Sequence, residues 1–154
     1  MKAGGVTMIE FKNIMVTTDL SENANAAVPY AAEMARRFNG SLELVHVFDP
    51  IQLTGSIRTK RADDLKRLAK VLGEQIHLPL NTVLLEGHPV TEIVHYATAS
   101  KAHCLIIATH GWTGLQHLLM GSVAERLVRL MPCPVLSIRP QHVKPIDYSK
   151  HKDQ

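Results

Sequence analysis

Short apolar runs alternate with amphipathic segments along this chain, and this alternation constrains the fold more than any other feature. The apolar runs predict five strands, over residues 14–18, 41–48, 82–85, 105–108 and 135–138. Apolar residues at helical spacing predict four helices between them, over residues 24–38, 60–76, 89–97 and 122–130. Four strand-helix units closed by a strand indicate an α/β fold: an open five-stranded parallel sheet, Rossmann-like, with helices on both faces.

The alternation alone fits two strand orders, 3-2-1-4-5 and 2-1-3-4-5. In both, ligands bind outside the carboxyl ends of the strands, at the point where the strand order reverses. We therefore expect the functional site in the loops that follow the strands.

A glycine-rich loop follows the fourth strand and leads into the fourth helix. Gly111, Gly114 and Gly121 allow a ligand to approach the main chain closely. Ser122 is expected to cap the helix, with Glu125 three residues later completing a capping box. The unpaired N–H groups and the positive dipole end of such a helix form a site for phosphate. The simpler alternative is that Ser122 only caps the helix and Gly121 only allows the turn.

The same loop carries a spaced motif that consists of Ala108, two residues, Gly111, nine residues, and then Gly121-Ser122. This motif resembles the nucleotide-binding signature of the universal stress protein family. Ala108 stands where the strict pattern has glycine, and its methyl group lies close to where the family places the adenosine. The resemblance covers residues 11–139 and implies the strand order 3-2-1-4-5. In that order the ends of strands one and four face one crevice.

The resemblance also implies which residues hold an adenine nucleotide. In the family an aspartate at the position of Asp19 contacts the adenosine, and Val47 would line the adenine pocket. The alternatives are that Asp19 caps the first helix or its turn and that Val47 is a core residue. His110 could bond a phosphate or act as a base, although a lone loop histidine more often does neither. The residues expected to bind the nucleotide are Thr17, Thr18, Asp19, Val47, Ala108, His110, Gly111, Gly121, Ser122 and Val123.

Missing motifs indicate binding without rapid turnover. The sequence contains no G-x-x-x-x-G-K-[ST] loop, no G-x-G-x-x-G after the first strand, and no obvious acid to hold a metal and orient an attacking water. We therefore expect a regulatory protein that binds ATP, or AMP or ADP, with slow or no hydrolysis and at most weak ATPase activity. Mg²⁺ could bridge the phosphates. The alternatives are a slow adenine-nucleotide hydrolase and a stress or signalling dimer that binds no nucleotide.

The resemblance implies a homodimer formed through the last strand, whose exposed edge could pair with its mate. The residues of that strand are Val135, Leu136, Ser137 and Ile138. A net charge of +3 without a stripe of Lys and Arg argues against a nucleic-acid partner. No apolar stretch is long enough to span a bilayer and no secretory signal is visible, so we expect a cytoplasmic protein.

The chain divides into a lead-in over residues 1–10, the family-like domain over residues 11–139, and a loose polar tail over residues 140–154. Cys104 and Cys133 match no zinc or redox motif, and we expect them to be small buried hydrophobic residues.

Overall fold

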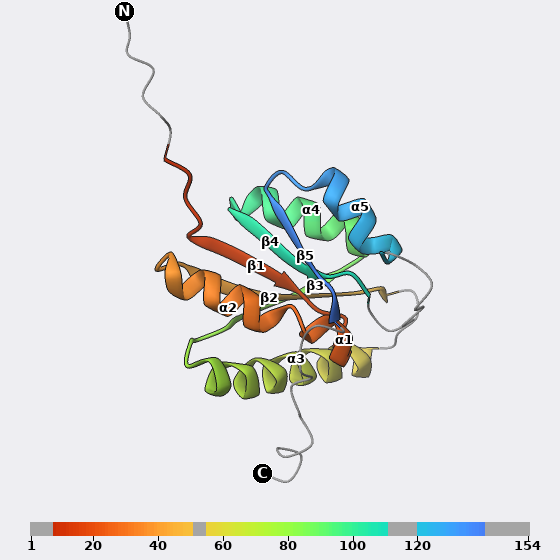
Figure 1. Ribbon diagram of the computed structural model, residues 1–154. Coiled ribbons are helices and arrows are strands. Elements are labelled where there is room, and N and C mark those ends of the chain that lie inside the picture. Colours follow the sequence, from red (N-terminus) through yellow and green to blue (C-terminus); the bar gives the residue numbers. More distant parts are fainter. Residues whose placement is uncertain (1–7, 51–54, 111–119, 141–154) are drawn as a thin grey trace, which may run out of the picture.

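The computed structural model describes residues 8–50, 55–110 and 120–140, and within them five parallel strands form one sheet (Figure 1). The strand order is β3-β2-β1-β4-β5, which confirms the order implied by the resemblance. The strands are β1 (Asn13–Thr17), β2 (Ser41–Phe48), β3 (Asn81–Glu86), β4 (Cys104–Ala108) and β5 (Val135–Ile138). The strand order reverses between β1 and β4, so a crevice opens at their carboxyl ends.

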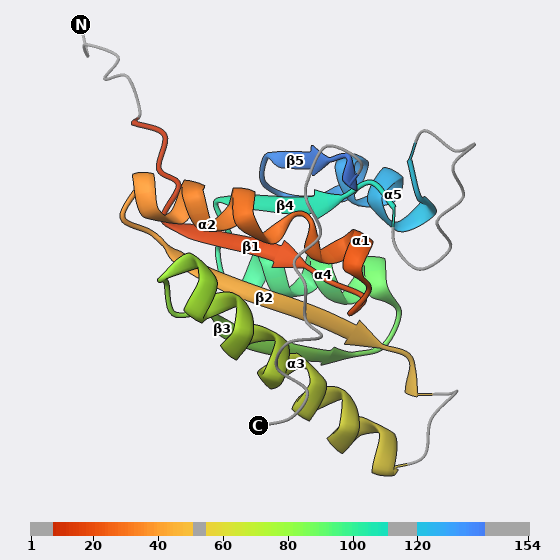
Figure 2. The same cartoon turned by 60° about the horizontal axis from the view of Figure 1, so that its bottom comes forward.

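Helices cover both faces of the sheet (Figure 2). The helices are α1 (Glu22–Asn25), α2 (Val28–Arg37), α3 (Gly55–Ile76), α4 (Pro89–Ala99) and α5 (Ser122–Leu130). One buried cluster joins the sheet to α2 and α3, and a second joins the opposite face to α4 and α5. The short helix α1 follows directly after β1 and lies at the carboxyl end of that strand (Figure 1).

The central strand β1 is buried on both faces, and alternation decides where each side chain lies. Ile14 and Val16 belong to the cluster with α2 and α3. Met15 belongs to the cluster with α4 and α5, so Thr17 lies on that second face. Thr17 is the last residue of β1, and its side chain therefore lies at the edge where the crevice opens.

The helix predicted over residues 24–38 is in fact two helices. The chain leaves helical structure at Ala26 and Ala27, and α2 begins at Val28 with Pro29 in its first turn. Proline lacks an N–H group, and its ring would clash with the carbonyl of Asn25 in a continuous helix. Pro29 therefore separates α1 from α2, which the apolar periodicity alone did not reveal.

Two other helices are longer than predicted, since α4 continues to Ala99 and α3 starts before residue 60. The helix predicted from residue 60 begins at Gly55, because its first turn carries too few apolar residues to show a period. In α5, Ala124 and Leu127 form the inward face, and Leu130 is 54% exposed. Cys104 is buried as predicted, and Cys133 is partly buried against the second cluster. The predictions for residues 1–7 and for the tail beyond 140 lie outside the described residues.

Candidate functional site

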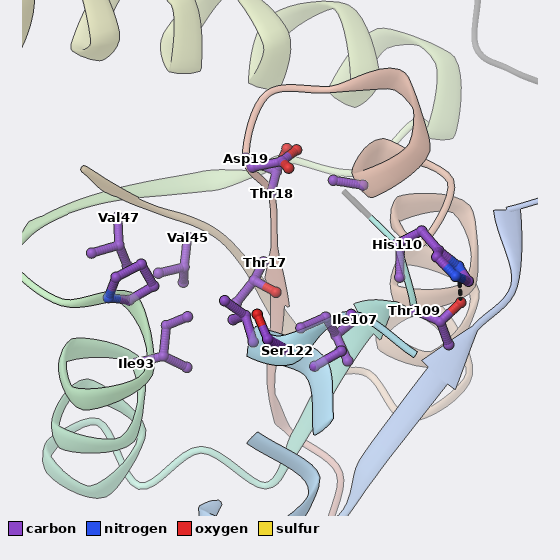
Figure 3. A pocket seen from close by; sticks show the side chains of 16 residues that line it. Thr17, Thr18, Asp19, Val45, Val47, Ile93, Ile107, Thr109, His110 and Ser122 are labelled. Atoms are coloured by element: carbon purple, nitrogen blue, oxygen red, sulfur yellow. Dashed lines mark hydrogen bonds between the residues drawn. The ribbon is translucent and has the colours of Figure 1, made fainter. Parts of the chain in front are cut away.

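A cavity of about 280 Å³ lies at the carboxyl ends of β1, β2 and β4, where the strand order reverses (Figure 3). It is closed on its other sides by α1, α4 and the start of α5. The residues that line it are Thr17, Thr18, Asp19, Ala24, Val45, Val47, Pro89, Ile93, Ile107, Ala108, Thr109, His110, Gly121, Ser122, Val123 and Ala124. Every predicted nucleotide-binding residue that the structure describes is among them, and Gly111 lies outside the described residues.

The floor of the cavity is the face of the sheet that packs against α4 and α5. Val45 of β2, Thr17 of β1 and Ile107 of β4 lie next to one another across three adjacent strands. Ile93 of α4 and Val47 extend the apolar lining toward the β2 side. One end of the cavity is therefore apolar and suits a flat, uncharged group such as a nucleobase.

The turn after β1 is fixed by hydrogen bonds that the chain makes with itself. The Thr18 N–H donates to the Val45 carbonyl (2.9 Å) and the Thr18 hydroxyl donates to Asn25 Oδ1 (2.6 Å). The Leu20 N–H donates to the same hydroxyl (2.9 Å), and Leu20 has a positive φ of 70°. Thr18 thus uses its polar groups within the protein and shapes the turn.

Asp19 stabilises the turn after β1 and also lines the cavity. Its Oδ1 accepts hydrogen bonds from the backbone N–H (2.9 Å) and the hydroxyl of Ser21, and Ser21 in turn caps α1. Asp19 therefore stabilises the turn, as the simpler alternative expected. It also lines the cavity.

His46 supports this turn from behind the sheet, a role that was not predicted from the sequence. Its Nδ1 lies 2.9 Å from the Thr18 carbonyl, and because a carbonyl only accepts, Nδ1 carries the proton. The other ring nitrogen, Nε2, is buried and has no hydrogen-bond partner within the described part of the chain. Burial lowers the pKa of His46 below its ordinary value of 6.5, while the bond to Thr18 acts in the opposite direction. A histidine in an otherwise apolar strand was the available signal.

The start of α5 also lines the cavity, and in Figure 3 Ser122 lies apart from Val47 and Ile93 of the apolar lining. Gly121 is the residue that precedes the helix, with extended backbone angles (φ −70°, ψ 154°), and α5 begins at Ser122. The Gly121 N–H donates to the Thr109 carbonyl (2.6 Å), and the Gly121 carbonyl accepts from the Glu125 N–H (2.9 Å).

The predicted capping box is therefore wrong, because Ser122 is already helical and cannot cap the helix that it starts. No side chain caps α5 among the described residues. The N–H groups of the first turn have no intrahelical acceptor, and the helix dipole adds positive potential. This end of the cavity suits an anion such as phosphate.

His110 and Ala108 complete the side formed by the end of β4. The Thr109 hydroxyl lies 2.9 Å from His110 Nδ1, and this contact holds the imidazole beside Thr109 (Figure 3). Ala108 is buried and contributes to the lining, so its methyl group occupies space that a glycine would leave open.

Two lining residues on α4, Pro89 and Ile93, were missed by the sequence reasoning as members of the site. They come from a helix that follows β3, and only the packing of α4 against the sheet brings them to the cavity. Among the described residues no group of three His, Cys, Asp or Glu side chains could hold a metal ion. No helix in that part of the chain is long and apolar enough to cross a membrane.

Comparison with known proteins identifies the family. The model of the universal stress protein family matches residues 10–139. A universal stress protein of Methanocaldococcus jannaschii is 30% identical over 141 residues, which covers 84% of this chain and 82% of that protein.

Solved structures share the fold. The universal stress protein from Archaeoglobus fulgidus in complex with dAMP is 22% identical, with a TM-score of 0.68 over 86% of this chain and 100% of its own. A universal stress protein in complex with cAMP is 21% identical, with a TM-score of 0.69 over 85% of this chain and 98% of its own. Because the family model covers most of the sequence, this chain belongs to the universal stress protein family.

Proposed function

We propose that the cavity binds an adenine nucleotide, with ATP the foremost candidate, and that the protein is a cytoplasmic regulator that responds to nucleotide occupancy. One observation carries the proposal: a single cavity has an apolar end at Val47 and Ile93 and a helix N-terminus at Gly121 and Ser122. A nucleotide has the same polarity, with an apolar base at one end and phosphates at the other. Two proteins with the same fold, described as complexes with dAMP and with cAMP, support an adenine nucleotide as the ligand class.

The residues present fit this ligand. The base would lie against Val45, Val47 and Ile93, the sugar near the end of β1, and the phosphates at the first turn of α5. Mg²⁺ could accompany the nucleotide by bridging its phosphates. Ala108 narrows the cavity by one methyl group, and its effect on affinity is part of the test.

Calorimetric titration of ligand-stripped protein with ATP, with and without Mg²⁺, tests the proposal, with GTP and AMP as controls for base and phosphate recognition. We expect saturable, adenine-selective binding that weakens as phosphates are removed. An absence of heat at millimolar ATP would contradict nucleotide binding and favour the alternative of a signalling dimer without a ligand.

A Gly121→Val variant tests the phosphate end of the cavity. A side chain at this position would begin 3.1 Å from the Thr109 carbonyl oxygen and extend toward the phosphate space. We expect affinity to fall at least about tenfold, because hydrogen bonds to charged groups contribute roughly 1.5–3 kcal/mol. Ser122→Ala is the matched control. It keeps the backbone N–H groups at the start of α5, so its affinity for ATP should fall less than that of Gly121→Val. Unchanged ATP affinity in folded Gly121→Val protein would refute the assignment.

Hydrolysis is the competing function, and the position of His110 at the cavity is the observation that favours it. We propose that turnover is slow or absent. A steady-state rate above roughly 1 s⁻¹, near the low end for enzymes, that disappears in His110→Ala would reverse this conclusion.

We also propose that two copies pair through β5, which is an edge strand of the sheet. Leu136 is 40% exposed there although it is a large apolar residue, and Ser137 beside it is exposed. Sedimentation at micromolar concentration should give a dimer, and Leu136→Lys should shift it toward monomer. A monomeric wild-type protein would contradict this pairing.

A further inference from the structure

Thr17 places a hydroxyl on the floor of the cavity. The residue is 7% exposed, and its side chain makes no hydrogen bond within the part of the chain that the structure describes. Its neighbours across the sheet are Val45 and Ile107, whose side chains can neither donate nor accept a hydrogen bond (Figure 3). Among the described residues, the fully buried side-chain atoms without a hydrogen-bond partner are His46 Nε2 and Ser100 Oγ. The Thr17 hydroxyl is not one of them, so it lies open to the cavity and is available to a ligand there.

The neighbouring threonine shows that this is not a general property of the strand end. Thr18 is equally buried, but its hydroxyl donates to Asn25 and accepts from the Leu20 N–H. The side chains of the two threonines point to opposite faces of the sheet, and both residues line the cavity, but only the Thr18 hydroxyl bonds partners in the described part of the protein. The Thr17 hydroxyl is thus directed at the space that a ligand would fill.

The position of Thr17 along the cavity indicates which part of a nucleotide it would meet. The strands run in the order β2, β1, β4 across the floor. Val45 and Val47 on the β2 side form the apolar end, and Ser122 with its helix start forms the anion end. Thr17 lies between them. In a nucleotide the sugar connects base to phosphate, so the group between the two ends is the sugar.

We propose that the Thr17 hydroxyl bonds a sugar hydroxyl of the bound nucleotide and makes the site prefer ribonucleotides to deoxyribonucleotides. The inference rests on the proposed function and deepens it. A hydroxyl both donates and accepts, so it can bond the 2′ or 3′ hydroxyl in either direction. The Asp19 carboxylate, which only accepts and is held by Ser21, is a second polar group at the same end of β1.

Calorimetry with ATP, 2′-deoxyATP and 3′-deoxyATP on wild type and Thr17→Val tests the proposal, because valine keeps the shape and removes the hydroxyl. We expect wild type to bind one of the deoxy nucleotides about tenfold more weakly than ATP, as a site built to bond a hydroxyl rejects an analogue that lacks it. Thr17→Val should bind ATP as weakly as that deoxy nucleotide and should show no preference between them. Thr17→Ser, which keeps the hydroxyl, should retain the preference.

A matched control and a second readout separate this role from a structural one. Thr98→Val removes a hydroxyl from the exposed face of α4, where it bonds only the Val94 carbonyl, and should leave all three affinities unchanged. Urea unfolding of the ligand-free protein should show Thr17→Val to be about as stable as wild type, because the hydroxyl makes no hydrogen bond within the described part of the chain. Wild-type stability combined with weaker ATP binding is the expected result.

Three outcomes would overturn the inference, and they are distinguishable. Unchanged ATP affinity in folded Thr17→Val would show that the hydroxyl does not contact the ligand. Equal weakening of ATP and both deoxy nucleotides would place its contact on the base or phosphate instead of the sugar. No binding of ATP by wild type would reject the proposed function itself, and with it any role of Thr17 toward a nucleotide.

Discussion

Replacing His46 with glutamine should remove a pH dependence from the free energy of unfolding. Burial lowers the pKa of His46 in the folded protein below its ordinary value of 6.5. Between these two pKa values the unfolded chain binds more protons than the folded one, so stability rises with pH. The contribution is fully present above pH 6.5, is lost as the pH falls toward the lowered pKa, and stops changing below it.

The slope of this loss follows from the linkage relation. One proton taken up on unfolding changes the free energy by at most about 1.4 kcal/mol per pH unit. The structure explains why the charged form is disfavoured: Nδ1 already donates to Thr18, and a proton added at Nε2 would find no acceptor among the described residues. Arg61 lowers the pKa further, while Asp19 and Asp64 raise it. Glutamine does not titrate, and its amide can still donate toward the Thr18 carbonyl.

Urea unfolding at several pH values between 8 and 5 measures the effect. The free energy of unfolding of wild type should fall below about pH 6.5. The free energy of unfolding of His46→Gln should depend less steeply on pH, by up to about 1.4 kcal/mol per pH unit. His95→Gln on the exposed face of α4 is the matched control and should follow wild type. If His46→Gln and wild type lost stability in parallel, the buried, neutral state assigned to His46 would be wrong.

Two further predictions test the packing that positions the site. A β-carbon on Gly40 would lie 2.7 Å from the Lys12 carbonyl oxygen. Gly40→Ala should therefore lower the free energy of unfolding, measured by urea titration, by roughly 1–3 kcal/mol. An unchanged midpoint of unfolding would contradict this close approach. Leu127 is fully buried, so Leu127→Ala should lower the free energy of unfolding by about 2–5 kcal/mol. Leu130 is 54% exposed, so Leu130→Ala should change the free energy of unfolding by no more than about 0.5 kcal/mol. Equal losses at the two positions would contradict the orientation of α5.

The sheet could be predicted from the sequence because its strands are short apolar runs between clear breaks. The predicted bounds of β2 and β5 agree with the structure, whereas β4 differs by one residue at its start and β1 and β3 differ by one residue at both ends. The order of the strands required the family resemblance, since alternation fits two orders equally well. Strand pairing depends on contacts between distant segments, which a local pattern does not contain.

The helix ends and the depth of the site were harder to predict. Pro29 separates α1 from α2 although the apolar residues continue at helical spacing across both helices. At α5 the residue before the helix is Gly121, whereas Ser122 was expected there. At both places the local backbone geometry decides where the helix begins. The predicted residues after β1 and β4 do meet at one cavity. The roles of His46 and Ile93 were not predicted, because in the sequence each is an ordinary residue of its own strand or helix. Their roles appear only when β2 and α4 pack around the crevice.

The double role of Asp19 can be separated by two substitutions. Its Oδ1 accepts two hydrogen bonds from Ser21, so the carboxylate is oriented before a ligand arrives. Asp19→Asn keeps an oxygen that can accept from the Ser21 N–H but removes the charge, whereas Asp19→Ala removes both. We therefore expect Asp19→Asn to unfold at nearly the wild-type urea concentration and Asp19→Ala to lose about 0.5–2 kcal/mol, as when a capping side chain is lost.

Nucleotide affinity should respond differently from stability. A carboxylate that bonds the nucleoside contributes a charge-assisted hydrogen bond, so both variants should bind ATP roughly 10- to 100-fold more weakly in calorimetry. Wild-type affinity in Asp19→Asn would mean that this carboxylate only holds the turn. In that case the preorganised group at the end of β1 would be Thr17 alone, and the preference for a sugar hydroxyl would depend entirely on it.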